Sequence, residues 1–248
     1  MNYKKLIKHS LLIEAVKIIL IAFIFIPDLS ASTKIDKDKK IIISTLEAHK
    51  DRLIEISDNI WEAAEPALLE FKSSKYLWDY AEENGFKVTK GVADIPTAFT
   101  AEYGSGRPII GIMGEFDANP GISQKKQPTK EPLIKGAAGH GCGHNLYGAA
   151  SLGAAIAIKE MIESGEISGT VRFYGTPAEE TIFAKVWMVR AGLFDDLDVC
   201  MDWHPGDEIE ASTQSSKALV DFRLRFYGDA SHASGDPWNG NSAVDAME

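Results

Sequence analysis

Several histidines in this sequence stand beside glycine, proline or serine, and they and several carboxylates fall where strand-like segments end or a glycine-rich loop enters a helix. Because open α/β sheets bind ligands at the carboxyl ends of their strands, we expect these side chains to meet at one edge of a sheet. The candidates are Asp117, Cys142, His144, Glu179, Glu180 and His204.

Thiolate, imidazole and carboxylate groups together suit Zn²⁺ and, with more oxygen ligands, Mn²⁺ or Co²⁺. The adjacent Glu179 and Glu180 strengthen this interpretation. Neighbouring residues on an extended backbone point in opposite directions, so one carboxylate can bind metal while the other serves as a general base for water. The set therefore predicts a hydrolytic metal centre.

Each segment, taken alone, also fits a simpler role. Gly139–His144 could be a flexible loop or an anion-binding turn before a helix. Pro177–Glu180 is also typical of a solvated helix start, and Trp203–Pro205 of a packed loop. A disulfide between Cys142 and Cys200 is a rival use of the thiol in an exported protein.

The segments between these residues alternate between helix and strand patterns. Helical spacing marks 37–64, 73–84, 145–163, with Asn145 as its N-cap, and 183–190. Strand patterns mark 97–103 and 108–115, joined as a hairpin, and then 170–174 and 197–203. The alternation predicts an α/β fold with a largely parallel, doubly wound sheet.

The pattern changes after about Glu210. Residues 217–227 alternate apolar and charged side chains, which predicts an antiparallel strand with one solvated face. A loop over 228–241 and a helix from Ser242 would follow. We therefore expect a metal-binding domain over 32–212 and the start of an α+β domain over 213–248.

The first residues are typical of a secretory signal. Lys4, Lys5 and Lys8 precede an apolar run, Ile18–Ile26, and small residues follow it, which predicts cleavage near Ala31. A membrane anchor is the alternative, but the run is far shorter than the roughly 20 residues that span a bilayer. We expect an exported protein, periplasmic or secreted, with no stable membrane association after cleavage of residues 1–31.

The composition excludes other classes of protein. Of 248 residues, 45% are hydrophobic and 25% charged, which is ordinary for a globular chain and argues against disorder. The 26 basic and 36 acidic residues give a net charge of −10. An acidic chain without a basic cluster beyond its first residues is not expected to bind nucleic acid.

Five motifs occur in the order seen in a known family, and the resemblance runs from about Asp38 to Glu248. The chain resembles the aminoacylase and glutamate-carboxypeptidase-like co-catalytic metallopeptidases, in their amidohydrolase branch, which includes p-aminobenzoyl-glutamate and auxin-conjugate hydrolases. The motifs are Gly114–Ala118, Gly139–Asn145, Gly175–Glu180, Trp203–Pro205 and Ser231–Ala233.

The resemblance implies a role for each candidate ligand. Cys142 would bridge two divalent metal ions, Zn²⁺ or Mn²⁺, with Co²⁺ as a further option. His144 and His204 would complete the coordination of one ion, and Glu180 would bind the other. Glu179 would be the general base for a metal-activated water. The substrate would be an N-acyl or aroyl amino acid, such as p-aminobenzoyl-glutamate, or a short peptide, cleaved at its amide bond.

The resemblance also implies residues that support the site. Asp117 would contact the metal ligands rather than the ions. His232 matches a loop histidine of a lid and dimerisation domain, which reaches a neighbouring active site in a homodimer and steadies the oxyanion. Both assignments are expectations from the family.

Two departures from the family pattern affect these expectations. Family members carry a further metal-binding histidine near the C-terminus, beyond where this chain ends, so we expect a C-terminally incomplete chain with little or no activity alone. Thr181–Phe183 replaces a glycine-richer stretch, which places the helix start in question. The alternatives are a non-catalytic binding or regulatory homologue that keeps the fold, and a thiol hydrolase using Cys142 with His144.

Overall fold

The computed structural model describes residues 29–211, 215 and 218–248. The chain divides into two units, Met1–Gly206 and Asp207–Glu248. The expected signal segment lies outside the described residues, except that its last three residues begin the first described helix. Among the residues described, no helix is both long and apolar enough to pass through a membrane.

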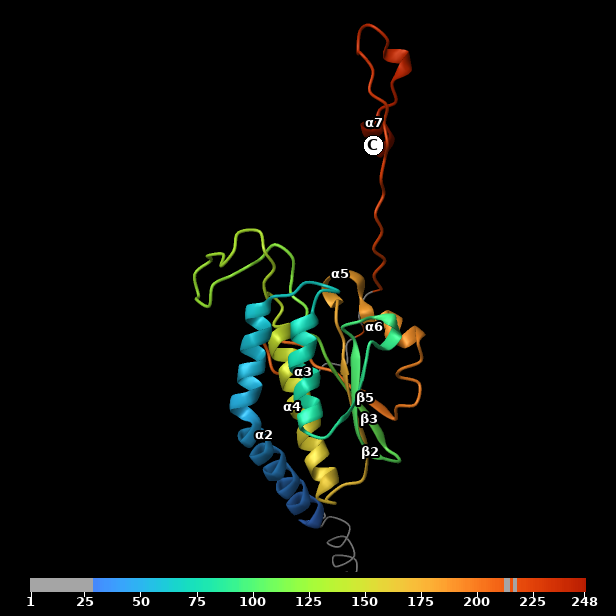
Figure 1. The fold of residues 1–248 in the computed structure, drawn as a ribbon. Coiled ribbons are helices and arrows are strands. Elements are labelled where there is room, and N and C mark those ends of the chain that lie inside the picture. Colours follow the sequence, from blue (N-terminus) through green and yellow to red (C-terminus); the bar gives the residue numbers. More distant parts are fainter. Residues whose placement is uncertain (1–28, 212–214, 216–217) are drawn as a thin grey trace, which may run out of the picture. The chain divides into compact units, whose positions relative to one another are not determined.

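The first unit contains a five-stranded sheet and its helices (Figure 1). In chain order the elements are α2 (Leu29–Ala63), α3 (Phe71–Glu83), β1 (Lys87–Lys90), the short 3-10 helix η1 (Val92–Asp94), β2 (Phe99–Ser105), β3 (Ile109–Gly114), α4 (His144–Glu163), β4 (Gly169–Gly175), α5 (Glu179–Ile182), α6 (Ala184–Arg190) and β5 (Val199–Met201). This arrangement confirms the α/β class with a central sheet.

The sheet is mixed, with the order β1-β2-β4-β3-β5. Strand β3 pairs in parallel with β4 and with β5, whereas β1–β2 and β2–β4 are antiparallel ladders. The parallel part of the sheet is therefore β4-β3-β5, and the antiparallel strands lie at its other side.

The predicted hairpin between β2 and β3 does not form, because β4 lies between them. Phe99 of β2 and Gly114 of β3 both face Gly175 of β4, from its two sides. A buried strand must have its backbone groups paired along both edges, and β2 and β3 supply those two edges. A Cβ at Gly175 would lie 2.1 Å from the Phe99 ring, so only glycine allows this approach.

The two faces of the sheet hold separate clusters of buried side chains. Phe173 of β4 packs in the cluster that includes residues of α2, α3 and α4, and its neighbour Tyr174 packs with Met188 of α6. This alternation follows from the two-residue period of a strand. Figure 1 shows α2, α3 and α4 on one side of the sheet and α6 on the other.

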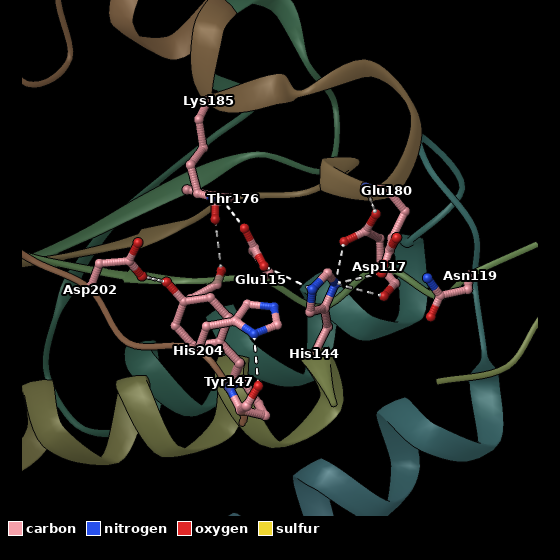
Figure 2. Close-up of polar contacts among 12 residues, drawn as sticks. Glu115, Asp117, Asn119, His144, Tyr147, Thr176, Glu180, Lys185, Asp202 and His204 are labelled. Carbon is pink, nitrogen blue, oxygen red and sulfur yellow. Dashed lines mark hydrogen bonds and ion pairs between the residues drawn. The ribbon is translucent and has the colours of Figure 1, made fainter. Parts of the chain in front are cut away.

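The three parallel strands determine where the candidate site forms. Strands β3, β4 and β5 end at Gly114, Gly175 and Met201. Since they run in the same direction, the residues that follow each strand emerge at the same edge of the sheet. Figure 2 shows side chains from all three segments close together.

The second unit lacks the strand predicted over 217–227. Residues 216–217 lie outside the described part, and 218–227 have no strand partner there. Phe222 is 74% exposed, because an isolated strand has neither a ladder nor a packed face to stabilise it. The expected helix does form, as α7 (Ala243–Met247), and the Ser242 side chain caps it by accepting from the Asp245 amide.

Candidate metal centre

Three of the predicted ligands lie together in the structure. Ligand atoms of Cys142, His144 and His204 all lie within 4.8 Å of one another. Ligands of one zinc ion in tetrahedral geometry lie roughly 3.5 Å apart, so small movements would bring these atoms around one ion. Cys142 precedes α4, His144 is the first residue of α4, and His204 follows β5.

Glycine allows the two loops that carry these residues to approach each other. Gly143 has φ +79°, a left-handed conformation, and it is the N-cap of α4. A Cβ there would lie 3.0 Å from the Pro205 side chain. The expected N-cap, Asn145, instead lies inside the helix, and its side chain donates a 3.0 Å hydrogen bond to the Ser57 hydroxyl.

Asp117 accepts hydrogen bonds from two residues that are predicted ligands. Nδ1 of His144 donates to Asp117 Oδ1 at 2.9 Å, and the backbone N–H of Glu180 donates to Asp117 Oδ2 at 2.8 Å. Asp117 is 1% exposed. One buried carboxylate therefore orients an imidazole and fixes the backbone of the residue that carries the predicted glutamate ligand.

Glu180 is the second residue of the short helix α5 and lies next to His144. Its Oε1 atom lies 3.8 Å from His144 Nδ1 and is buried without a hydrogen-bond partner. Ala178, the N-cap of α5, has a left-handed conformation with φ +58°, which is strained for a residue with a Cβ. The helix thus starts one residue before Glu180, and the Thr181–Phe183 departure leaves both glutamates in the first turn.

The electrostatics of this cluster reflect buried carboxylates. Burial opposes protonation of His144, but the hydrogen bond to Asp117 and the charges of Asp117, Glu180 and Glu179 outweigh it and raise the pKa of His144. Burial, followed by repulsion from Glu180, raises the pKa of Glu179. Burial and the Glu180 carboxylate also raise the pKa of the Cys142 thiol.

The sequence interpretation missed Glu115 and Lys185. Glu115 Oε2 lies 2.9 Å from His144 Nε2, and Lys185 of α6 donates to the other oxygen, Oε1. Burial lowers the pKa of Lys185 to about 8. Glu115 stands at the end of β3, two residues before Asp117, and that position was a usable signal. Nothing local marks Lys185, because only the tertiary fold brings α6 to this edge.

The buried donor atoms fit a divalent cation. Oε1 of Glu180 is buried and lacks a hydrogen-bond partner, and Nε2 of His144 and Oε2 of Glu115 are buried with only their 2.9 Å contact to each other. Buried polar atoms normally have partners, so unpartnered ones in a cluster indicate a missing group. A second group of possible ligands, Glu115, His144 and Glu179, shares His144 with the first. Both groups combine donors that zinc and manganese accept.

The rival disulfide is not present, since Cys142 and Cys200 are both free thiols. Cys200 lies in β5, as expected, but it is exposed at the edge of the sheet. A cavity of about 520 Å³ borders Cys142 and His204, and Trp61 and Leu146 also line it. The cavity offers space for a small organic molecule beside the predicted ligands.

Aromatic residues support the loop that carries His204. The Tyr147 hydroxyl donates to the Asp202 carboxylate, and the Tyr147 ring lies 5.3 Å from the Trp203 ring. Trp203 Nε1 donates to the Ser151 hydroxyl at 2.9 Å. Both contacts anchor the residues after β5 to α4, which also carries His144.

His232 lies in the second unit, on the loop before α7, and is exposed. Its Nδ1 atom accepts from the backbone amides of Ser234 and Gly235, at 3.2 Å and 2.9 Å. The neutral ring therefore carries its proton on Nε2.

Known relatives share this chain's sequence and fold. One of the two polypeptides of p-aminobenzoyl-glutamate hydrolase from Escherichia coli (strain K12) is 43% identical over 213 residues, which cover 84% of this chain and 44% of the relative. Human Xaa-Arg dipeptidase is 32% identical over 212 residues, which cover 79% of this chain and 45% of the dipeptidase. The chain thus spans about half the length of the curated relatives it matches.

A solved structure of a dinuclear metal-binding M20 peptidase from Bacillus subtilis matches with a TM-score of 0.56 and 26% identity, covering 64% of this chain and 44% of that one. Residues 111–239, just over half of the chain, match the family described as "Peptidase family M20/M25/M40". That range contains Asp117 and all four predicted metal ligands. The chain therefore belongs to peptidase family M20/M25/M40.

Proposed function

We propose that this chain is part of a metal-dependent amidohydrolase that cleaves the amide bond of an N-acyl or aroyl amino acid. The observation that carries the proposal is the convergence of Cys142, His144 and His204 within 4.8 Å, beside the unpartnered buried oxygen of Glu180. The 43% identical relative is named for p-aminobenzoyl-glutamate, so we take that compound as the first substrate to test.

In this proposal Cys142, His144 and His204 hold one divalent ion, and Cys142 and Glu180 hold the second. Bound ions would polarise the scissile carbonyl and make water more acidic. Asp117 would keep the proton of His144 on Nδ1, which leaves the lone pair of Nε2 free to bind metal.

Glu179 is the proposed general base. It is half-buried in the first turn of α5, next to the proposed ligand Glu180. Its raised pKa makes it a better proton acceptor than a solvated glutamate, which suits a group that takes a proton from water and returns it to the leaving amine.

We also propose that the complete enzyme is a homodimer, in which His232 donates its Nε2 proton to the developing oxyanion in the partner's site. The exposure of His232 and the tautomer set by its Nδ1 contacts support this role. Export through the N-terminal segment is likewise a proposal from the sequence pattern.

This 248-residue polypeptide is proposed to have little activity by itself. In the described part of the chain, the second ion would have only two of the proposed ligands, Cys142 and Glu180. Catalytic zinc sites usually have about three protein ligands. A non-catalytic binding or regulatory homologue is the competing proposal.

The test measures release of p-aminobenzoate from p-aminobenzoyl-glutamate by residues 32–248, stripped of metal and then reloaded with Mn²⁺ or Zn²⁺. The E. coli relative is assayed in parallel. We expect metal-dependent turnover far below that of the relative. Glu179→Gln should lower kcat by roughly 10²-fold or more while the protein keeps its metal.

Three outcomes would contradict parts of the proposal. Stoichiometric metal binding with no metal-dependent turnover, in this chain and in a longer form, would favour the regulatory homologue. Full turnover by Glu179→Gln would remove this residue from the role of base. Turnover equal to that of the relative would refute the expectation that this polypeptide is nearly inactive.

A further inference from the structure

Glu70 is a buried carboxylate outside the proposed metal-binding set. It is 0% exposed, and its side chain reaches the segment that precedes Glu179. We propose that Glu70 is a positioning residue, which holds the backbone at Ala178 so that Glu179 is presented to the substrate. This inference rests on the proposed function of Glu179 as the base.

The contacts of Glu70 connect two loops. Its Oε1 atom accepts from the backbone N–H of Ala178 at 2.9 Å, and its Oε2 atom accepts from the Thr97 hydroxyl at 3.0 Å. Hydrogen bonds to a charged carboxylate are about twice as strong as neutral ones. The bond to Ala178 spans 108 positions in the sequence, so it fixes tertiary rather than local structure.

The Glu70 carboxylate does not cap the helix that Glu70 precedes. Glu70 is the N-cap of α3, yet its side chain makes no capping hydrogen bond. Glu65 takes that role, and accepts from the backbone amides of Lys72 and Ser73 at 3.0 Å and 2.8 Å. The Glu70 side chain is thereby free to turn away from its own helix toward Ala178.

Ala178 needs an external hydrogen bond because its conformation is unfavourable. A left-handed φ of +58° costs roughly 1–2 kcal/mol for a residue with a Cβ. On its other side, the Ala178 carbonyl accepts from the amides of Ile182 and Phe183, at 3.2 Å and 3.0 Å, and so closes α5. Glu70 therefore fixes the peptide group from which α5 begins.

Glu179 lies between two backbone amides that are each held by a carboxylate. The Ala178 amide is bound by Glu70 and the Glu180 amide by Asp117. With both neighbours anchored, the backbone of Glu179 is held in place, and with it the point from which the Glu179 side chain projects. Burial raises the pKa of Glu70 to about 7, so the fold buries this carboxylate at a cost to its charged form.

The experiment replaces Glu70 in the 32–248 chain by three residues. Glu70→Gln keeps an acceptor for the Ala178 amide, Glu70→Asp keeps the charge but draws it back, and Glu70→Met removes the acceptor at similar length. Thr97→Val is the matched control, because it removes the other hydrogen bond of Glu70 only. Exchange of the Ala178 amide proton, measured by NMR, reports the contact without any need for metal or turnover.

We expect exchange at Ala178 to be at least tenfold faster in Glu70→Met and intermediate in Glu70→Asp, with core strand amides unchanged. Glu70→Gln and Thr97→Val should resemble the wild type. In the metal-loaded chain, kcat for p-aminobenzoyl-glutamate should fall at least tenfold in Glu70→Met, with KM within threefold, and Glu70→Gln should restore it.

The proposal is overturned if Glu70→Met and Glu70→Asp leave exchange at Ala178 unchanged, or if kcat stays at the wild-type value despite faster exchange. It is also overturned if all amides exchange faster together, since that would mean a general loss of stability. Metal binding without turnover, in the wild-type chain and in a longer form of it, would refute the proposed function instead, while the exchange data would still decide whether Glu70 anchors Ala178.

Discussion

Replacing Asp117 by asparagine should weaken metal binding with little change in shape. Asp117 accepts from His144 Nδ1 at 2.9 Å and from the Glu180 amide at 2.8 Å. Both partners are donors, and an asparagine side chain offers only one acceptor oxygen. Its amide group must therefore face one of the two donors, which breaks that bond and leaves either His144 or Glu180 misplaced.

The size of the effect follows from these two bonds. Losing one hydrogen bond to a buried charged group costs about 1.5–3 kcal/mol. Substitutions of groups that orient metal ligands typically lower metal affinity by about 10–100-fold, or about 1.4–2.7 kcal/mol. We therefore expect the Kd for Zn²⁺ to rise by about 10–100-fold in Asp117→Asn.

The assay is competition for Zn²⁺ with a chelator of known affinity, at pH 8. The pH matters because removal of the Asp117 charge also lowers the pKa of His144, and at acidic pH easier deprotonation would mask part of the loss. Asp196→Asn is the matched control, since Asp196 forms an ion pair with Arg172 and stands before β5 rather than after it. Equal affinity for Zn²⁺ in wild type and Asp117→Asn would refute the reasoning.

Further experiments test Cys142 as a metal ligand, the packing of α4 and the burial of Glu70. Zn²⁺ should protect Cys142, but not Cys200, from iodoacetamide at pH 8, and equal labelling of Cys142 with and without Zn²⁺ would exclude it as a ligand. Gly148→Ala should destabilise the chain by about 1–3 kcal/mol in urea unfolding, because a Cβ there meets the backbone oxygen of the residue after β3 at 2.7 Å. Gly153→Ala, in the same helix, should be nearly neutral, because its Cβ meets a flexible leucine end. Glu70 has a raised pKa, so wild-type stability should fall as pH rises from about 4.5 to 7, as the unfolded chain loses its proton first. Glu70→Gln should remove this slope, a relative gain on the order of 3 kcal/mol by pH 8, and identical slopes would contradict the burial argument.

The sequence predicted most elements of the first unit, though not β1 or η1, and the edge where the candidate ligands meet. The helices from 37, 73 and 145 and the strands ending near Glu115, Tyr174 and Trp203 were local patterns of apolar spacing. The rule that parallel strands share a carboxyl edge then placed Cys142, His144, Glu180 and His204 near one another. Their proximity in space is therefore a consequence of strand direction, whereas their roles as ligands stay predictions.

The strand order was not predictable from local patterns. Residues 97–115 contain two strands and a glycine turn, and such a stretch is typical of a hairpin. The insertion of β4 between β2 and β3 depends on pairing across more than 60 positions, between Phe99 and Gly175 and between Gly114 and Gly175. Likewise, the alternation over 217–227 has the period of a strand, but a strand forms only when a partner supplies the ladder.

Besides Lys185, the residues that sequence reasoning missed are acids whose importance comes from tertiary contacts. Glu115 and Glu70 stand among ordinary charged residues in the sequence, yet they are 4% and 0% exposed. Glu115 faces His144, and Glu70 binds the Ala178 amide. The position of Glu115 after β3 was a usable signal, but no spacing rule identifies Glu70, because its partner is brought in by another element of the fold.

Charge balance gives these acids a common physical reason. Several carboxylates converge at the carboxyl edge of β3 and β4, against the cations Lys185 and, when protonated, His144. Burying like charges together raises their pKa values and opposes folding unless opposite charge compensates them. Some of this cost is offset by the backbone amides of Ala178 and Glu180, which donate to Glu70 and Asp117. The same hydrogen bonds hold the backbone on either side of Glu179. The buried Oε1 atom of Glu180 accepts no such hydrogen bond in the described part of the chain, and a divalent cation is the group whose charge and ligand preference would supply the missing partner.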